Sequence, residues 1–304
     1  MNFQTMVWGL VKMKEILEAL FLGIIQGVTE FLPISSSGHM SIFRHFTGME
    51  LEGAGLFSAM LHMGTLVAIF VVFYKPIYEL FIEFFACIKD IFSKKFSFKL
   101  KDMSTTRRML FMFILSCVPL LILLIPVGNG NNLMDVVGNL GSDNSIKAEG
   151  ICFMITGFLL LLGNSVSETT KRFRKVSPFS ALMIGIAQFF AACFPGISRS
   201  GSTISTAMCC RMSKKSAVRY SFILSVPAVI ASALVEFKDA METTEIIPVF
   251  PLIVGVVASA VVGIFAIKLL QVIINKNLFK YFGIYCTALG IIVCNIGAVE
   301  VFVK

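Results

Sequence analysis

The chain is organised around the stretch Gln26-Gly-Val-Thr-Glu-Phe-Leu-Pro-Ile-Ser-Ser-Ser-Gly-His39, which lies inside an otherwise apolar segment, residues 16–46. Pro33 and Gly38 disfavour a continuous helix at this point. The interruption carries a carboxylate, three hydroxyls and an imidazole within ten residues. Working outward from it, we expect two short helices with reactive polar side chains where they meet.

The composition of the whole chain indicates that the break is surrounded by a lipid bilayer and not by water. Of 304 residues, 57% are hydrophobic and only 14% are charged, against roughly 25% charged in typical soluble domains. The mean hydropathy of +0.87 excludes a disordered chain and argues strongly against a soluble enzyme. The net charge of +8 indicates inside-facing loops rather than binding to nucleic acid. We therefore expect a single integral membrane domain over residues 1–304.

The hydrophobic segments predict an all-α polytopic membrane protein with six transmembrane helices. A hydrocarbon core of about 30 Å needs about 20 helical residues. Six stretches meet or nearly meet this length: 55–74, 109–127, 150–163, 217–237, 247–270 and 281–303. Two further apolar regions, 16–46 and 179–211, are each interrupted, and their halves are too short to span. Broken helices at membrane depth are tolerated where they line a cavity or pack within protein, so we expect two re-entrant helix pairs.

Basic residues cluster in three connections, 75–108, 171–175 and 211–219. With six crossings and two re-entrant pairs, all three connections fall on one side together with the lysines of 268–280, which by the positive-inside rule is cytoplasmic. Segments 128–149 and 238–245 and both termini then lie opposite. The segment 76–92 carries four charged residues, so we expect a surface-lying amphipathic helix. A seventh crossing there would break this agreement.

The two interrupted regions resemble each other. Gly23, Gln26 and Pro33 match Gly185, Gln188 and Pro195 at an offset of 162, and two further pairs match at 163. Those pairs are Ser37-Gly38 with Ser200-Gly201, and Phe57-Ser58 with Tyr220-Ser221. An odd number of crossings separates the two regions, which predicts an inverted-topology repeat whose broken helices meet near the midplane. We assign residues 16–163 to the first repeat and 179–303 to the second.

The first break carries ionisable groups where burial is costly. Gln26 and Glu30 are four residues apart, hence on one helix face. An ionisable residue inside the membrane is by default a candidate functional residue, and His39 follows within the same break. An alternative is that Glu30 and His39 only pair with each other to stabilise the helix break.

The second break reads Pro-Gly-Ile-Ser-Arg-Ser-Gly-Ser-Thr over residues 195–203. Its single arginine, Arg199, stands among hydroxyls and glycine just before a helix. Free N–H groups at a helix N-terminus favour anions, and the arginine fork suits phosphate oxygens. The alternative is that Arg199 only balances the charge of Glu30. Together the two breaks suit phosphoryl chemistry in a membrane-facing cavity.

Other candidate residues carry weaker signals. We expect His62, inside an apolar helix, to be a hydrogen-bonded packing residue and His45 to lie at the membrane interface. The eight cysteines show no paired metal-ligand spacing with histidine, so we interpret them as small buried apolar side chains.

The motifs at 26–39 and 195–203 resemble the two signature motifs of the bacterial undecaprenyl-diphosphate phosphatases, also called bacitracin-resistance phosphatases. The resemblance runs from about Ile16 to the C-terminus. It implies a multi-pass enzyme of the bacterial plasma membrane, with a site open to the outer face, that recycles the cell-wall lipid carrier from its diphosphate. It implies essential roles for Glu30, His39 and Arg199, and Ser36 as nucleophile. It also implies a divalent cation, usually Mg²⁺, although Gln26 stands where the family often has a glutamate.

Several alternatives stay open at this point. The attacking group is either Ser36 or a water held by His39 or Glu30, and Glu30 is the one named candidate for a metal ligand. We expect seven further residues to contact the substrate: Gln26, Ser35, Ser37, Ser198, Ser200, Gly201 and Thr203. The competing function is a secondary transporter of an anionic or lipid-linked substrate, and a structural scaffold leaves the polar group unexplained. The expected partners are a polyprenyl diphosphate and membrane lipids, with the oligomeric state open, a homodimer included.

Overall fold

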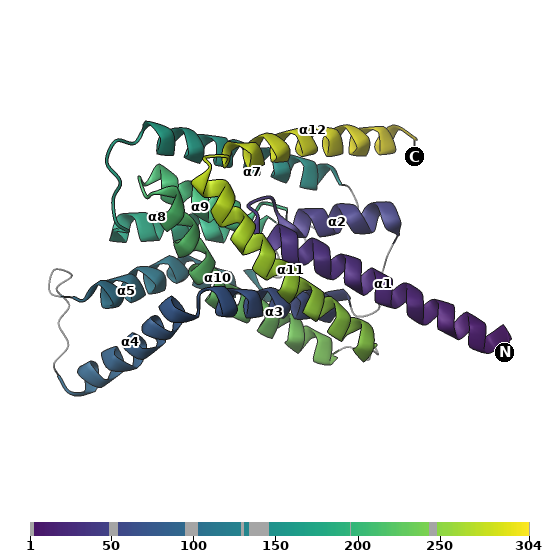
Figure 1. Cartoon of the computed structure of the whole chain (residues 1–304), viewed down its shortest axis with the longest axis horizontal. Helices are drawn as coiled ribbons and strands as arrows, with labels where there is room; N and C mark the ends of the chain where they lie inside the picture. The colour runs from purple at the N-terminus through teal and green to yellow at the C-terminus, as the bar shows by residue number, and fades with distance from the viewer. Residues whose placement is uncertain are drawn as a thin grey trace.

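A computed structural model describes residues 3–48, 54–94, 103–128, 131–133, 146–194, 196–242 and 248–303. Helices dominate it (Figure 1). In chain order its elements are α1 (Phe3–Phe31), α2 (Ser36–Thr47), α3 (Ala54–Val72), α4 (Tyr74–Phe92), α5 (Thr105–Cys117), the 3₁₀ helix η1 (Val118–Leu124), β1 (Pro126–Gly128), β2 (Asn131–Asn132), α7 (Lys147–Thr169), α8 (Pro178–Cys193), α9 (Arg199–Cys209), α10 (Lys214–Glu242), α11 (Val249–Asn275) and α12 (Lys280–Val303). The antiparallel pair β1–β2 was not predicted from the sequence.

Among the described residues, six segments are long and apolar enough to cross a membrane, as predicted. They are Gly55–Val72, Thr105–Leu124, Lys147–Thr169, Lys214–Val235, Val249–Asn275 and Lys280–Glu300. The segment Lys147–Thr169 is longer than its apolar stretch because α7 extends into polar flanks at both ends. The segment Thr105–Leu124 continues from α5 into η1, which has Pro119 in its first turn. The chain is therefore a polytopic helical membrane protein.

Both interrupted regions break where predicted. Helix α1 ends at Phe31 and α2 begins at Ser36, while α8 ends at Cys193 and α9 begins at Arg199. Helix α9 has 11 residues, a length of about 16 Å, too short to cross the hydrocarbon core. Helix α1 has 29 residues, about 43 Å, because it begins well before the apolar segment, so the prediction that both halves of the first region are too short to span is wrong for α1. Pro195 lies outside the described residues, as do Lys95, Lys99, Lys101 and much of the connections 128–149 and 238–245.

Close helix packing holds the broken pairs in place. Helix α1 runs along α11, and α8 lies against α5 and η1. A Cβ on Gly23 of α1 would lie 2.4 Å from the carbonyl oxygen of Gly255 in α11, and a Cβ on Gly185 of α8 would lie 2.5 Å from that of Ser116 in α5. Both contacts bring one helix backbone against another, so only glycine fits.

Helices α7 and α12 form a second tight pair along one edge of the molecule (Figure 1). A Cβ on Gly150, Gly157, Gly283 or Gly290 would meet the facing helix at 3.0 Å or less. Without a hydrophobic force between helices in lipid, such small-residue contacts are what hold transmembrane helices together.

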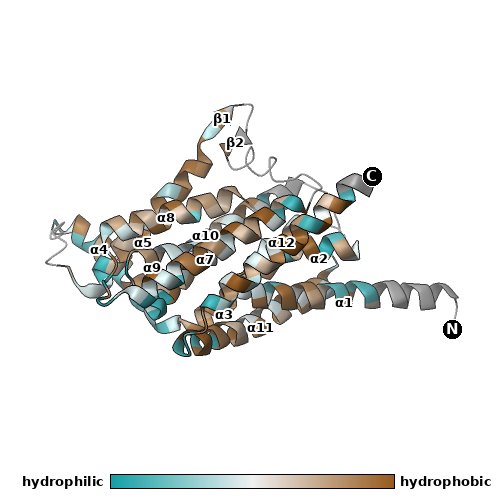
Figure 2. Cartoon of the chain, turned by 90° about the horizontal axis from the view of Figure 1, so that it is seen from above, coloured by the Kyte–Doolittle hydropathy of each residue, from teal (hydrophilic) through white to brown (hydrophobic). Residues whose placement is uncertain are grey.

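The polar connections gather at the ends of the long apolar helices, as Figure 2 shows by colour. In Figure 1 the basic connection 170–177 lies at the end opposite both termini. Helix α4 lies beside α5, to which it is joined by ion pairs from Arg107 to Glu83 (2.6 Å) and Asp90 (2.8 Å). Helix α4 is not among the six candidate spans, and its position on the membrane surface stays a prediction.

Candidate active site

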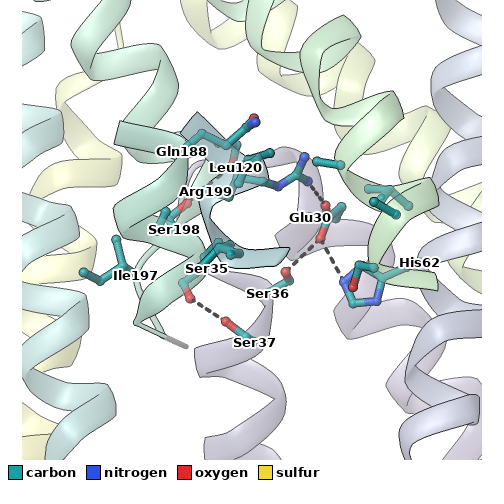
Figure 3. A pocket seen from close by; sticks show the side chains of 18 of the residues that line it. Glu30, Ser35, Ser36, Ser37, His62, Leu120, Gln188, Ile197, Ser198 and Arg199 are labelled. Carbon is teal, nitrogen blue, oxygen red and sulfur yellow. Dashed lines mark hydrogen bonds and ion pairs between the residues drawn. The ribbon is translucent and has the colours of Figure 1, made fainter. Parts of the chain in front are cut away.

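Glu30, in the last turn of α1, is the centre of the candidate site (Figure 3). Its side chain is buried, yet it accepts hydrogen bonds from the Ser36 hydroxyl at 2.8 Å and the Gln26 amide at 3.1 Å. The Arg199 guanidinium, 169 residues further along the chain, forms an ion pair with its other carboxylate oxygen. The structure therefore brings the two breaks together through one carboxylate.

The serines of the first break are held by the start of α2. Ser35 is the N-cap, and its Oγ accepts a hydrogen bond from the Gly38 N–H at 3.2 Å. Its φ of 73° lies in the left-handed region, which is uncommon for a residue other than glycine. That turn directs the chain back so that Ser36, the first residue of α2, faces Glu30. The Ser37 hydroxyl accepts from the Gly196 N–H of the second break at 3.1 Å.

The second break repeats this cap geometry. Ser198 is the N-cap of α9, and its Oγ accepts from the Gly201 N–H at 3.0 Å. In both breaks the cap oxygen also lies 3.4 Å from a second serine hydroxyl, that of Ser37 or of Ser200. Two helix N-termini, each with free N–H groups and a positive dipole end, therefore stand on either side of Glu30.

These groups line a cavity of about 330 Å³. Its polar side includes seven of the predicted residues: Glu30, Ser35, Ser36, Ser37, Ser198, Arg199 and Ser200. Its other side is apolar, built by η1 with Leu120, Leu121 and Leu124 and by α10 with Val229 and Val235. Leu121 and Leu124 are more than half exposed on the outside of the bundle. The cavity therefore joins a polar floor to a wall that continues towards the lipid.

His62 of α3 also lines the cavity, which the sequence analysis missed. Its Nε2 lies 3.7 Å from Glu30 Oε2, while Nδ1 bonds to the Ser58 carbonyl oxygen at 2.9 Å. The prediction of a hydrogen-bonded residue is confirmed, but the sequence analysis did not place it beside Glu30. An ionisable side chain inside an apolar helix was a usable signal, although nothing local to the sequence shows which face of α3 meets α1.

His39 lies elsewhere. Its ring bonds to the Ser35 carbonyl oxygen and to the Tyr285 hydroxyl, both at 2.7 Å, and packs against Phe153. It is not among the residues that line the cavity, and it does not pair with Glu30. A water held by His39, one of the alternatives left open by the sequence, would require the imidazole at the cavity. Instead α2 continues through Gly38, which turns the imidazole towards α12.

The remaining predicted residues support the floor without lining it. Gln26 orients Glu30, Gly201 is part of the α9 cap, and the Thr203 hydroxyl bonds within α9 and to Ser221 at 2.6 Å. The sequence analysis missed Gln188 as a lining residue, although its match to Gln26 was a usable signal. Its amide nitrogen is buried without a hydrogen-bond partner and stands at the cavity. His45 lies away from the cavity, where its Nε2 is 2.8 Å from Glu300 Oε1.

The cavity offers few metal ligands. Within the described residues no three His, Cys, Asp or Glu side chains come together as a metal site would require. Glu30 is the one carboxylate of the cavity lining, and both its oxygens are engaged. Mg²⁺ prefers oxygen ligands in octahedral geometry, so these side chains alone do not fit a protein-held Mg²⁺ centre.

Comparison with known proteins places the chain in a family. A family model described as bacitracin resistance protein BacA matches residues 19–292, a range that includes both breaks. The chain belongs to the BacA family. Three similar proteins extend the match over nearly the whole chain. "Undecaprenyl-diphosphatase" of Halothermothrix orenii is 37% identical over 281 residues, covering 92% of this chain and 97% of that protein.

The protein of the same name from Methanosphaera stadtmanae is 36% identical, with the same coverage. "Undecaprenyl-diphosphatase 4" of Bacillus thuringiensis strain Al Hakam is 34% identical over 294 residues, covering 94% of this chain and 99% of that protein. The BacA family match therefore includes Glu30, Ser36, His62 and Arg199 in one continuous alignment range.

Proposed function

We propose that this chain is an undecaprenyl-diphosphate phosphatase, which removes the terminal phosphate of the lipid diphosphate and returns undecaprenyl phosphate as carrier for cell-wall synthesis. Membership of the BacA family and relatives named for this activity support the reaction and its association with bacitracin resistance. The observation that carries the proposal is Glu30 bonded at once to the Ser36 hydroxyl and the Arg199 guanidinium, in a cavity with an apolar wall.

The diphosphate head is recognised at the polar floor. A diphosphate carries two to three negative charges, which the Arg199 fork and the N–H groups at the starts of α2 and α9 meet directly. The hydroxyls of Ser37, Ser198 and Ser200 add neutral hydrogen-bond donors around the same space. The polyprenyl chain leaves along Leu121 and Leu124, which extend from the cavity to the outer surface of the helices.

Hydrolysis proceeds through Ser36. Its hydroxyl already donates to Glu30, so Glu30 is the base that receives its proton. The Ser36 oxygen then bonds to the terminal phosphorus as the bridging P–O bond breaks, and undecaprenyl phosphate leaves. Glu30 passes the Ser36 proton through His62 to the phosphate oxygen that leaves, and so becomes a carboxylate again. Water then attacks the phosphoserine and gives a proton to Glu30. As the bond between the Ser36 oxygen and phosphorus breaks and inorganic phosphate departs, Glu30 returns this proton to the Ser36 oxygen.

The competing route is direct attack by water, with Ser36 only donating to phosphate. Phosphate release from undecaprenyl diphosphate by purified protein, measured with Ser36→Ala, separates the routes. We expect Ser36→Ala to lose several orders of magnitude in kcat, whereas loss of one donor lowers it about 10- to 1000-fold. Retention of a few per cent of the activity would rule out the serine route. Binding of the lipid without any phosphate release by the unmodified chain would favour a transporter instead.

We propose that a divalent cation binds together with the substrate. Because the cavity offers one carboxylate that is already engaged, the donor set favours a cation bound by the diphosphate over one held by the chain. Phosphate release should stop in EDTA and return with Mg²⁺. Equilibrium dialysis should find no stoichiometric Mg²⁺ on the protein without substrate, and such binding would contradict this part of the proposal.

We also propose that the two broken pairs are re-entrant halves of an inverted repeat. At the offset of 163 residues, Ser35 corresponds to Ser198 and Gly38 to Gly201, and both pairs make the same cap bond. The same offset aligns Ser36 with Arg199. Related positions in the two halves therefore supply the two different groups that touch Glu30.

The chemistry is nevertheless asymmetric. At the offset of 162, the position corresponding to Glu30 is Ala192, which lines the cavity without a polar group. Two breaks therefore form a single site. We propose that this site opens to the outer face of the bacterial plasma membrane, because it lies at the opposite ends of α5 and α10 from the basic connections.

A further inference from the structure

A second cavity, of about 390 Å³, lies at the other end of the same helices that build the catalytic cavity. Its walls come from residues 105–113 of α5, residues 213–223 at the start of α10, and the connection 173–176 between α7 and α8. The catalytic cavity is lined further along the same chain direction, by 120–124 and 228–235. The two cavities share no lining residue. We call the second one the basic cavity.

The charge of the basic cavity is one-sided. Four cationic side chains line it, namely Arg108, Arg174, Lys175 and Arg219, and among the described residues no aspartate or glutamate does. None of the four makes an ion pair within the described residues. The neighbouring Arg107 shows the contrast, since Glu83 and Asp90 both neutralise it. In the part of the chain that the structure describes, one of two adjacent arginines is therefore paired with carboxylates and the other is not.

Arg108 is held at the cavity with spare donors. Its Nη2 makes only a long hydrogen bond, 3.5 Å, to the Val176 carbonyl oxygen, and its Nε is buried without a partner. A buried N–H without an acceptor is costly, and an oxygen ligand in the cavity would satisfy it. Helices α5 and α10 both begin at the cavity, with Thr105 and Ser216 in its lining, so their positive dipole ends add to the attraction for an anion.

Part of the lining is apolar. It comprises Met109, Phe113, Met212 and Ile223, with Phe173 next to Arg174 in the chain. A free phosphate ion gains nothing from such side chains. A phosphate group that carries acyl chains gains from both halves, because its head meets the arginines and its chains meet the apolar lining and the lipid-exposed helices.

We propose that the basic cavity binds the phosphate headgroup of an anionic membrane lipid, at the face of the bundle opposite the catalytic cavity. Basic pockets between transmembrane helices recognise anionic lipid heads in this way. The site differs from the polyprenyl diphosphate site in its residues, in its position and in having no nucleophile beside its arginines. It stands whether or not the chain has phosphatase activity.

Native mass spectrometry of the full chain tests the proposal, with phosphatidylglycerol and phosphatidylcholine as matched probes. We expect one phosphatidylglycerol to bind at least about tenfold more tightly than phosphatidylcholine. The double variant Arg108→Gln/Arg219→Gln should reduce this preference to about two- or threefold. The control Lys171→Gln/Arg172→Gln removes the same charge from the same end of the molecule but from outside the cavity, and should keep the preference.

Two results would overturn the proposal. Equal losses in the two double variants would mean that surface charge, and not the cavity, attracts the lipid. Complete displacement of phosphatidylglycerol by millimolar inorganic phosphate would mean a simple anion site. The single variant Arg219→Gln changes an exposed side chain that forms no ion pair among the described residues. It guards against a folding defect of the double variant and should weaken the preference by about threefold.

Discussion

The ion pair between Glu30 and Arg199 should contribute to stability as well as to catalysis. The Glu30 side chain is 5% exposed and that of Arg199 is 25% exposed. Breaking a buried pair by removing one partner leaves an uncompensated charge and costs about 3–5 kcal/mol. In Arg199→Ala the carboxylate keeps the hydrogen bonds from Ser36 and Gln26, and the cavity is open, so we expect the lower end, about 3 kcal/mol.

A double-mutant cycle isolates this coupling. In the Glu30→Gln background no charge needs compensation, so Arg199→Ala should cost only about 1 kcal/mol, giving a coupling of about 2 kcal/mol. For a chain of 304 residues, about 3 kcal/mol corresponds to a fall in Tm of roughly 5 °C. A thiol-reactive fluorogenic dye can report unfolding in detergent, because the thiols of Cys87, Cys193 and Cys286 are buried in the folded chain.

The control is the Tm of Glu30→Gln itself, which should lie closer to that of the unmodified chain than the Tm of Arg199→Ala does. Equal shifts for Arg199→Ala in both backgrounds would refute the reasoning, because the two side chains would then act independently.

Three further predictions concern activity and topology. Arg199→Lys should recover little of the phosphate release lost in Arg199→Ala, because lysine lacks the bidentate fork; near-normal kcat/KM would count against bidentate recognition. His62→Ala should lower kcat by about 100-fold as a lost proton-transfer group, whereas the control His45→Ala should leave it unchanged, and equal values for the two would remove His62 from the site. After replacement of the native cysteines, Arg172→Cys should resist a membrane-impermeant thiol reagent in intact cells while Asn131→Cys reacts; the opposite pattern would reverse the proposed orientation.

The sequence by itself determined the helices, their interruptions and the reactive residue types. Bilayer thickness sets the length of a spanning helix, so six apolar stretches were enough to predict the six candidate spans. The breaks were equally local, because a serine cap and a glycine three residues later fix where α2 and α9 begin. The glutamate and the arginine were evident because ionisable groups are rare in apolar surroundings.

Only the tertiary structure decided which of those groups meet. Glu30 and Arg199 lie 169 residues apart, and their contact depends on how α1 and α9 pack, which no local pattern specifies. The same packing brings His62 to the carboxylate and turns His39 to Tyr285. Successive residues of a helix are rotated by about 100°, so each side chain lies on a definite face of its helix. Which group it contacts depends on where the neighbouring helix packs.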